Sequence, residues 1–77
     1  MTIKVLVFGQ LSDIIPQKEM NFSTVKNTEE LRLELLKQFP AIAEVNYTIA
    51  VNKKVVNQTE VLKDQDTVAL LPAFSGG

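Results

Sequence analysis

The chain has 77 residues, of which 45% are hydrophobic and 22% are charged, the composition of one folded domain rather than of a disordered chain. Cysteine and histidine are both absent, which excludes a disulfide, a thiolate zinc site, an iron–sulfur cluster and a Ser-His-Asp hydrolase. The formal net charge is −1 and the charges are interspersed, so the basic stripe typical of nucleic-acid binders is missing and we expect no nucleic-acid partner.

The first predicted element is a strand over residues 3–8, where hydrophobicity alternates with a period of two. The face that we assign to the core carries Ile3, Val5 and Val7, and the opposite face carries Lys4, Leu6 and Phe8. This apolar run contains a lysine and is too short for a secretory signal or a membrane span. We therefore expect a cytoplasmic protein without a membrane partner.

A loop and a second strand complete a predicted N-terminal hairpin. Residues 9–17 (GQLSDIIPQ) contain the breakers of a loop, with buried anchors expected at Leu11 and at Ile14 or Ile15. The second strand is expected over residues 18–25, and one of its faces carries Met20 and Phe22.

The sequence NTEELRLELLKQFP predicts the main helix. Thr28 or Asn27 can cap its first turn, where Glu29 and Glu30 complement the positive end of the helix dipole. Pro40 stops the helix at the residue before it. The apolar stripe, which we assign to the core, consists of Leu31, Leu35 and Phe39, widened by Leu36.

Three further strands are predicted in the second half of the chain. A loop with Ile42 precedes a strand at residues 47–51 (YTIAV), and residues 52–54 (NKK) form a hairpin turn into a short strand at Val55-Val56. A connection over residues 57–66 has one expected buried anchor, Leu62. The last strand covers residues 67–71, with Val68 and Leu70 facing opposite to Thr67, Ala69 and Leu71.

Asp64 and Asp66 flank Gln65 just before the last strand. Paired carboxylates can bind a metal or act as acid and base, but this position favours a polar turn, and we expect no metal site. After Pro72 the residues AFSGG show no periodicity, so residues 73–77 are expected to form a flexible tail. The order β-β-α-β-β-β predicts a single α+β domain over residues 1–77, with the helix on one sheet face.

Two of the three glycines occupy the last two positions, after a stretch that reads VALLPAFSGG. The stretches IKVLVFGQL, VNKKVV and LKDQDTVALLPAFSGG together resemble the sulfur-carrier family of molybdopterin synthase small subunits. That resemblance covers the whole chain and implies the β-grasp, ubiquitin-like fold, with a mixed sheet of about five strands. Gln65 departs from the family's glycine between the two aspartates, and Ala73 departs from its second proline.

The resemblance also implies the chemistry. An E1-like adenylyltransferase would use ATP to adenylate the carboxylate of Gly77, and sulfur would displace AMP to leave a thiocarboxylate, a stronger nucleophile than the carboxylate. This sulfur would pass to cyclic pyranopterin monophosphate in the large synthase subunit, whose active site Phe74, Ser75 and Gly76 would enter. Family members imply a heterotetramer of two small and two large subunits, no stably bound cofactor, and no catalysis by the small subunit alone.

The predicted partner contacts are Phe8, Val55 and Leu71. In a β-grasp sheet the first and last strands are parallel neighbours, so Phe8 and Leu71 are expected to end at one edge, beside the start of the tail. Both occupy the faces opposite the predicted core rows, and Val55 from the short strand is the third member. Exposed apolar residues of this kind usually mark a partner surface.

Three alternatives remain open from the sequence. The chain could carry sulfur for thiamine synthesis or for another sulfur pathway, since such carriers also end in Gly-Gly. It could be a ubiquitin-like modifier that joins Gly77 to lysines of target proteins. It could also be an interaction module whose terminal glycines have no function.

Overall fold

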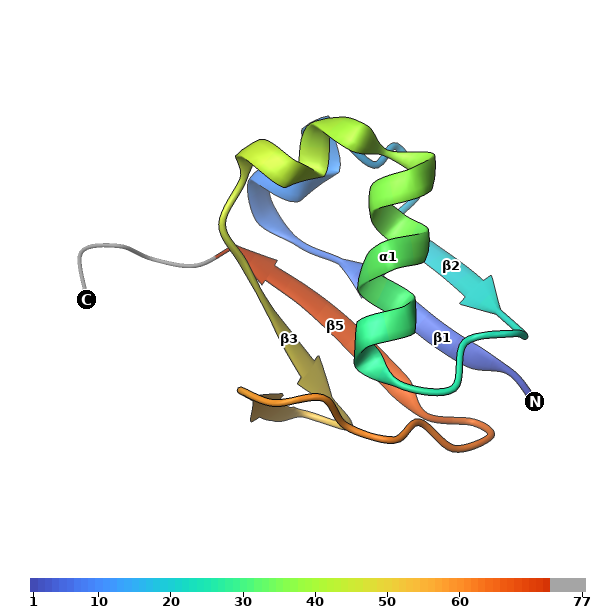
Figure 1. The fold of residues 1–77 in the computed structure, drawn as a ribbon. Helices are drawn as coiled ribbons and strands as arrows, with labels where there is room; N and C mark the ends of the chain where they lie inside the picture. The colour runs from blue at the N-terminus through green and yellow to red at the C-terminus, as the bar shows by residue number, and fades with distance from the viewer. Residues whose placement is uncertain (73–77) are drawn as a thin grey trace.

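The computed structural model describes residues 1–72 and shows a sheet of five strands with one α-helix packed against it (Figure 1). Its elements in chain order are β1 (Ile3–Val7), η1 (Gly9–Asp13), β2 (Glu19–Phe22), α1 (Thr28–Gln38), η2 (Pro40–Glu44), β3 (Tyr47–Val51), β4 (Lys54–Val56) and β5 (Thr67–Pro72). Both η elements are short 3₁₀ helices within segments that the sequence predicts as loops.

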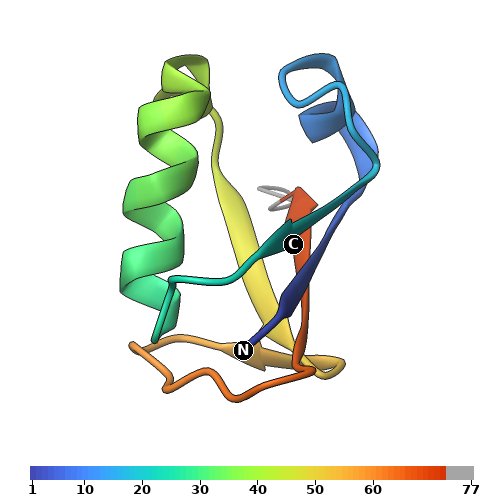
Figure 2. The same cartoon turned by 90° about the vertical axis from the view of Figure 1, so that its right-hand side faces the viewer.

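The strands are arranged in the order β2-β1-β5-β3-β4. The first and last strands, β1 and β5, are parallel, whereas the other neighbouring pairs are antiparallel. Figure 2 shows α1 on one side of these strands, so one sheet face is covered by the helix. This arrangement confirms the predicted α+β, β-grasp fold. We call the sheet face away from α1 the outer face.

The core lies between the sheet and α1 and contains the residues that the alternation predicts. Val5 of β1, Leu70 of β5, and Leu31 and Leu35 of α1 are fully buried. Four side chains from the connecting segments close the core at its ends, namely Leu11, Ile15, Ile42 and Leu62. Ile15 is therefore the second anchor of the first loop. Burial of these apolar side chains is the main source of stability in a domain of this size.

The prediction that Leu36 widens the buried helix stripe is wrong, because this side chain is 41% exposed. Successive helix residues are rotated by about 100°, so Leu36 points well away from Leu35 and off the contact line. Phe39, the C-cap residue, is partly buried against the core as expected. The helix begins with Asn27 as its cap, whose side chain accepts a hydrogen bond from the Glu30 N–H.

Several strand boundaries differ from the prediction: β1 ends one residue earlier, β4 begins one residue earlier, and β2 is shorter at both ends. The largest difference arises because a strand needs a partner for its hydrogen bonds. The second strand ends at Phe22, which pairs with Ile3, the first residue of β1, and nothing in the sheet remains to pair with residues 23–25. Val25 is nevertheless buried. The last strand extends one residue further than predicted, since Pro72 lies opposite Tyr47 of β3.

The turn before β5 is polar, as predicted, and is held by its two aspartates. The Asp66 carboxylate accepts hydrogen bonds from the Lys63 N–H and the Asn52 side chain, while Asp64 accepts one from the Thr2 N–H. Hydrogen bonds to its charged form, chiefly from Asn52, lower the pKa of Asp66. Gln65 between them has φ of 73°, the left-handed conformation that favours glycine.

Candidate functional site

The predicted tail residues Phe74, Ser75, Gly76 and Gly77 lie outside the described residues. The structure does fix Pro72, the residue from which this segment continues. Pro72 pairs with Tyr47 at the end of β5, and the Phe8 N–H donates a hydrogen bond of 3.2 Å to the Leu70 carbonyl on the other side of the strand. The last described residues are thus held by neighbours on both sides.

Gly9 packs directly against Pro72. A Cβ atom at position 9 would lie 2.3 Å from Pro72 Cγ, and the φ angle of Gly9 is 65°. A side chain is disfavoured there by contact and by backbone conformation together. Glycine therefore allows η1 to support the end of β5, close to the start of residues 73–77.

Phe8 and Leu71 lie side by side on the outer face, as the sequence predicts. Val7, the last residue of β1, pairs with Leu70, and the N–H of the next residue, Phe8, donates a hydrogen bond to the Leu70 carbonyl, which places Phe8 beside the end of β5. Phe8 is 45% exposed and Leu71 is partly buried, whereas Val7 and Leu70 are in the core. The face assignment is confirmed by this burial pattern. That these side chains contact a partner remains a prediction.

Val55 lies at the other side of the sheet, on the edge strand β4, and is 53% exposed. A row of apolar residues, one from each of four strands, runs from Val55 to β1. Its other three members were not selected as contacts by sequence reasoning. The pairing register gives this row as Val55, Ala50, Ala69 and Leu6. The middle of the row is little exposed, since Ala50 is 4% exposed and Ala69 is partly buried, so Val55 is its most exposed member.

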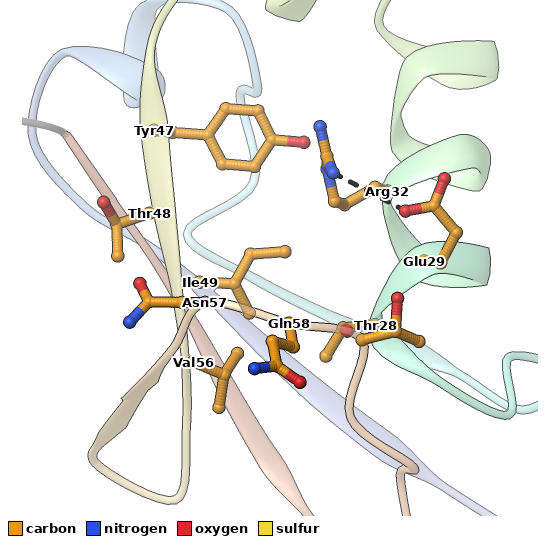
Figure 3. Close-up of a pocket in the computed structure, with 10 residues that line it drawn as sticks. Thr28, Glu29, Arg32, Tyr47, Thr48, Ile49, Val56, Asn57 and Gln58 are labelled. Carbon is orange, nitrogen blue, oxygen red and sulfur yellow. Dashed lines mark ion pairs between the residues drawn. The ribbon is translucent and has the colours of Figure 1, made fainter.

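A separate cleft of about 390 Å³ lies on the helix side of the sheet, between α1, β3 and the segment after β4 (Figure 3). Its charged residues neutralise each other, since Arg32 and Glu29 form an ion pair of 3.5 Å. Figure 3 shows the Tyr47 side chain pointing toward Arg32 across the cleft. The remaining lining is mostly hydroxyl and amide groups, without a nucleophile and base in the arrangement that covalent catalysis needs.

Within residues 1–72, no three Asp or Glu side chains come together in a way that could hold a metal ion. None of the helices in this described part is long and apolar enough to cross a lipid bilayer. Among the exposed large hydrophobic side chains of residues 1–72, Phe8 and Val55 lie on the outer face, whereas Leu33 and Leu36 lie on α1.

Comparison with known protein families shows to which family the chain belongs. The ThiS family model matches residues 5–77. The chain belongs to the ThiS family. This match leaves out only the first two residues of β1 and otherwise covers all five strands, α1 and the terminal Gly-Gly.

Individual relatives give more specific similarities than the family match. The chain is 35% identical to the molybdopterin synthase sulfur carrier subunit of Chlamydomonas reinhardtii, and the alignment covers 100% of both chains. It is also similar, at 28% identity, 100% coverage of both chains and a TM-score of 0.72, to a protein in the complex of subunits 1 and 2 of molybdopterin-converting factor from Helicobacter pylori. The Chlamydomonas relative is thus named as a sulfur carrier, and the Helicobacter structure is a complex of two subunits.

Two further solved structures show the fold alone. A putative molybdopterin converting factor subunit 1 from Pyrococcus furiosus has a TM-score of 0.86 at 24% identity, with 95% of this chain and 98% of that chain covered. Small archaeal modifier protein 1 from Methanosarcina acetivorans has a TM-score of 0.83 at 23% identity, with 99% and 96% covered. Because proteins of both names share this fold, the fold does not decide between sulfur carrier and protein modifier.

Proposed function

We propose that this chain is the sulfur-carrier subunit of molybdopterin synthase and that it works with a large subunit as its partner. The relative that is 35% identical over the full length of both chains carries that function in its name. The ThiS family match alone would fit carriers of several sulfur pathways, so the full-length relative is what favours the molybdopterin pathway over thiamine synthesis.

The chemistry is proposed for the carboxylate of Gly77, because the ThiS family match extends to this residue. A carboxylate is a poor acyl donor until its oxygen becomes part of a leaving group. An E1-like enzyme would use ATP to form an acyl-adenylate at Gly77, with release of pyrophosphate. A sulfide equivalent would then displace AMP. The resulting thiocarboxylate donates sulfur to a precursor bound in the large subunit.

The observation that carries the docking role is the position of Phe8 and Leu71. Both lie on the uncovered outer face, beside the end of β5 from which residues 73–77 continue. A partner that covers this face would therefore also contact the end of β5 near Pro72, the last residue before 73–77. An apolar surface of this kind is costly to leave in water, and burying it drives association.

Docking is tested by substituting aspartate on the outer face. Phe8→Asp and Leu71→Asp are expected to weaken binding to the large subunit by more than about tenfold, because a charge would be buried in an apolar contact. Leu33→Asp on α1 is the matched control, since Leu33 is 58% exposed on the helix. Binding is measured by calorimetry and folding by circular dichroism. If all three variants bind the large subunit with the affinity of the wild type, the outer face is not the interface.

Sulfur carriage is tested by the mass of the C-terminal peptide after incubation with an E1-like enzyme, ATP and sulfide. Replacing one carboxyl oxygen by sulfur adds about 16 Da, as does oxidation of Met1 or Met20, so the gain must be localised to the fragment that ends at Gly77. A reaction without ATP is the control. A C-terminus joined to lysines instead would identify a protein modifier, and an unchanged carboxylate with every activating enzyme would exclude a carrier.

A further inference from the structure

A hollow of about 450 Å³ opens next to Phe8 on the β2 side of the outer face. It lies between the end of β1, the 3₁₀ turn η1 and the start of β2, and its lining residues are Leu6, Val7, Phe8, Gly9, Ser12, Lys18 and Glu19. Leu71 and Val55 do not line it. Leu6 therefore belongs both to the apolar row described above and to the lining of this hollow, and Phe8 forms another part of the lining.

The hollow is apolar inside, because Leu6 and Phe8 point to the outer face and Gly9 adds no side chain. The polar groups come from Ser12 of η1 and from two charged residues at or next to the edge strand β2. Such a concave apolar site with a few polar groups at its rim can take up a large side chain of a docking protein, and buried anchors of this kind supply much of the binding energy of an interface.

The rim carries one lysine, Lys18, and one carboxylate, Glu19. Glu19 is close to Lys4, with 3.9 Å between its Oε2 and the Lys4 Nζ. Lys18 forms no ion pair with any side chain of residues 1–72. Since the one carboxylate at the rim already has a cationic neighbour, the Lys18 ammonium is left to attract an acidic group from outside.

We propose that this hollow receives a large apolar side chain of the large subunit, and that a carboxylate beside that anchor in the large subunit pairs with Lys18. The inference rests on the proposed function, because it takes the large subunit as the occupant. It extends the docking surface past Phe8 onto β2 and η1, a region that the predicted contacts Phe8, Val55 and Leu71 do not include.

Two variants test the two parts of the site in the full-length chain. Ser12→Trp places a large ring over the hollow and is expected to weaken binding of the large subunit about 30-fold, the loss typical of a removed central anchor. Lys18→Glu reverses the charge at the rim and is expected to weaken binding about fivefold to tenfold at low salt, with a smaller effect as ionic strength rises.

Each variant has a control of the same chemistry elsewhere on the chain. Ser23→Trp adds the same ring at an exposed serine after β2, and Lys37→Glu makes the same charge reversal on α1. Both controls are expected to bind like the wild type within about twofold. Melting curves by circular dichroism show whether each variant folds, and Lys18→Glu alone decides the rim contact if Ser12→Trp fails to fold.

The possible results separate this inference from the proposed function. If the wild type binds the large subunit, Phe8→Asp does not, and Ser12→Trp and Lys18→Glu bind normally, the hollow is empty in the complex and the inference is wrong while the docking role stands. If the two variants lose binding only to the E1-like enzyme, the occupant is that enzyme and the inference is again wrong. If the wild type does not bind the large subunit, the proposed docking role and this inference are both wrong.

Discussion

Replacing Gln65 by glycine is expected to stabilise the protein. Gln65 has φ of 73° in the turn before β5, and its N–H donates a hydrogen bond of 2.8 Å to the Thr2 carbonyl, which ties the turn to the N-terminus. Its side chain is exposed and makes only a long contact, 3.4 Å, with Asp64. The substitution therefore relieves the backbone and removes little else.

The magnitude follows from two opposing terms. The left-handed conformation costs a residue with a Cβ atom about 1–2 kcal/mol, whereas glycine loses about 0.4–1 kcal/mol more through the greater freedom of its unfolded chain. The difference leaves Gln65→Gly more stable by roughly 0.5–1 kcal/mol, which corresponds to a rise in Tm of about 2–8 °C in a domain of this size.

Thermal unfolding followed by circular dichroism measures this change, with Gln58→Gly as the control. Gln58 is also an exposed glutamine outside the helices and strands, but it is not among the residues with positive φ. Its replacement is expected to lower stability by about 0.5–1 kcal/mol. A fall in Tm of the same size for both variants would refute the reasoning, since it would mean that no backbone strain is relieved at position 65.

Further predictions concern the core, the acid range and the start of the tail. Leu31→Ala is expected to lower the free energy of unfolding by about 2–5 kcal/mol, whereas Leu36→Ala, at a 41% exposed side chain, should cost less than about 1 kcal/mol in urea titrations. Because hydrogen bonds lower the folded-state pKa of Asp66, its contribution is complete above the unfolded-state pKa of about 3.9 and is lost as pH falls through the lower folded-state value. Asp66→Asn should therefore weaken the pH dependence of stability below about pH 4, and an unchanged acid profile would contradict this. Gly9→Ala, whose Cβ would lie 2.3 Å from Pro72, should cost about 1–3 kcal/mol, and a melting curve like that of the wild type would show that η1 can move away.

Local sequence determined the secondary structure where a single residue type, such as proline, or the spacing of hydrophobic residues is sufficient to predict it. Alternation placed Ile3 and Val5 of β1 in the core, the four-residue spacing of Leu31 and Leu35 defined the buried side of α1, and Pro40 ended that helix. These features depend on side chains that are close along the chain, so their pattern can be read without a partner. The same pattern failed at Leu36, where a hydrophobic residue faces solvent.

The assembled outer face could only be decided by the tertiary structure. Phe8 and Leu71 were predicted together because the resemblance supplied the parallel pairing of the first and last strands. The row through Ala50 and Ala69 depends on the register between strands that are far apart in sequence. A shift of one residue in that register would turn the same side chains to the other face.

The sequence by itself therefore determined the strands, the main helix and most of the core, because each depends on residue type and local spacing. The reactive role of Gly77 is a prediction that the family resemblance implies. The tertiary structure decided where β2 and β5 end, that glycine at position 9 supports Pro72, and that a hollow with Lys18 at its rim adjoins Phe8. These features arise from contacts between η1, β2 and β5, which the order of residues along the chain does not specify.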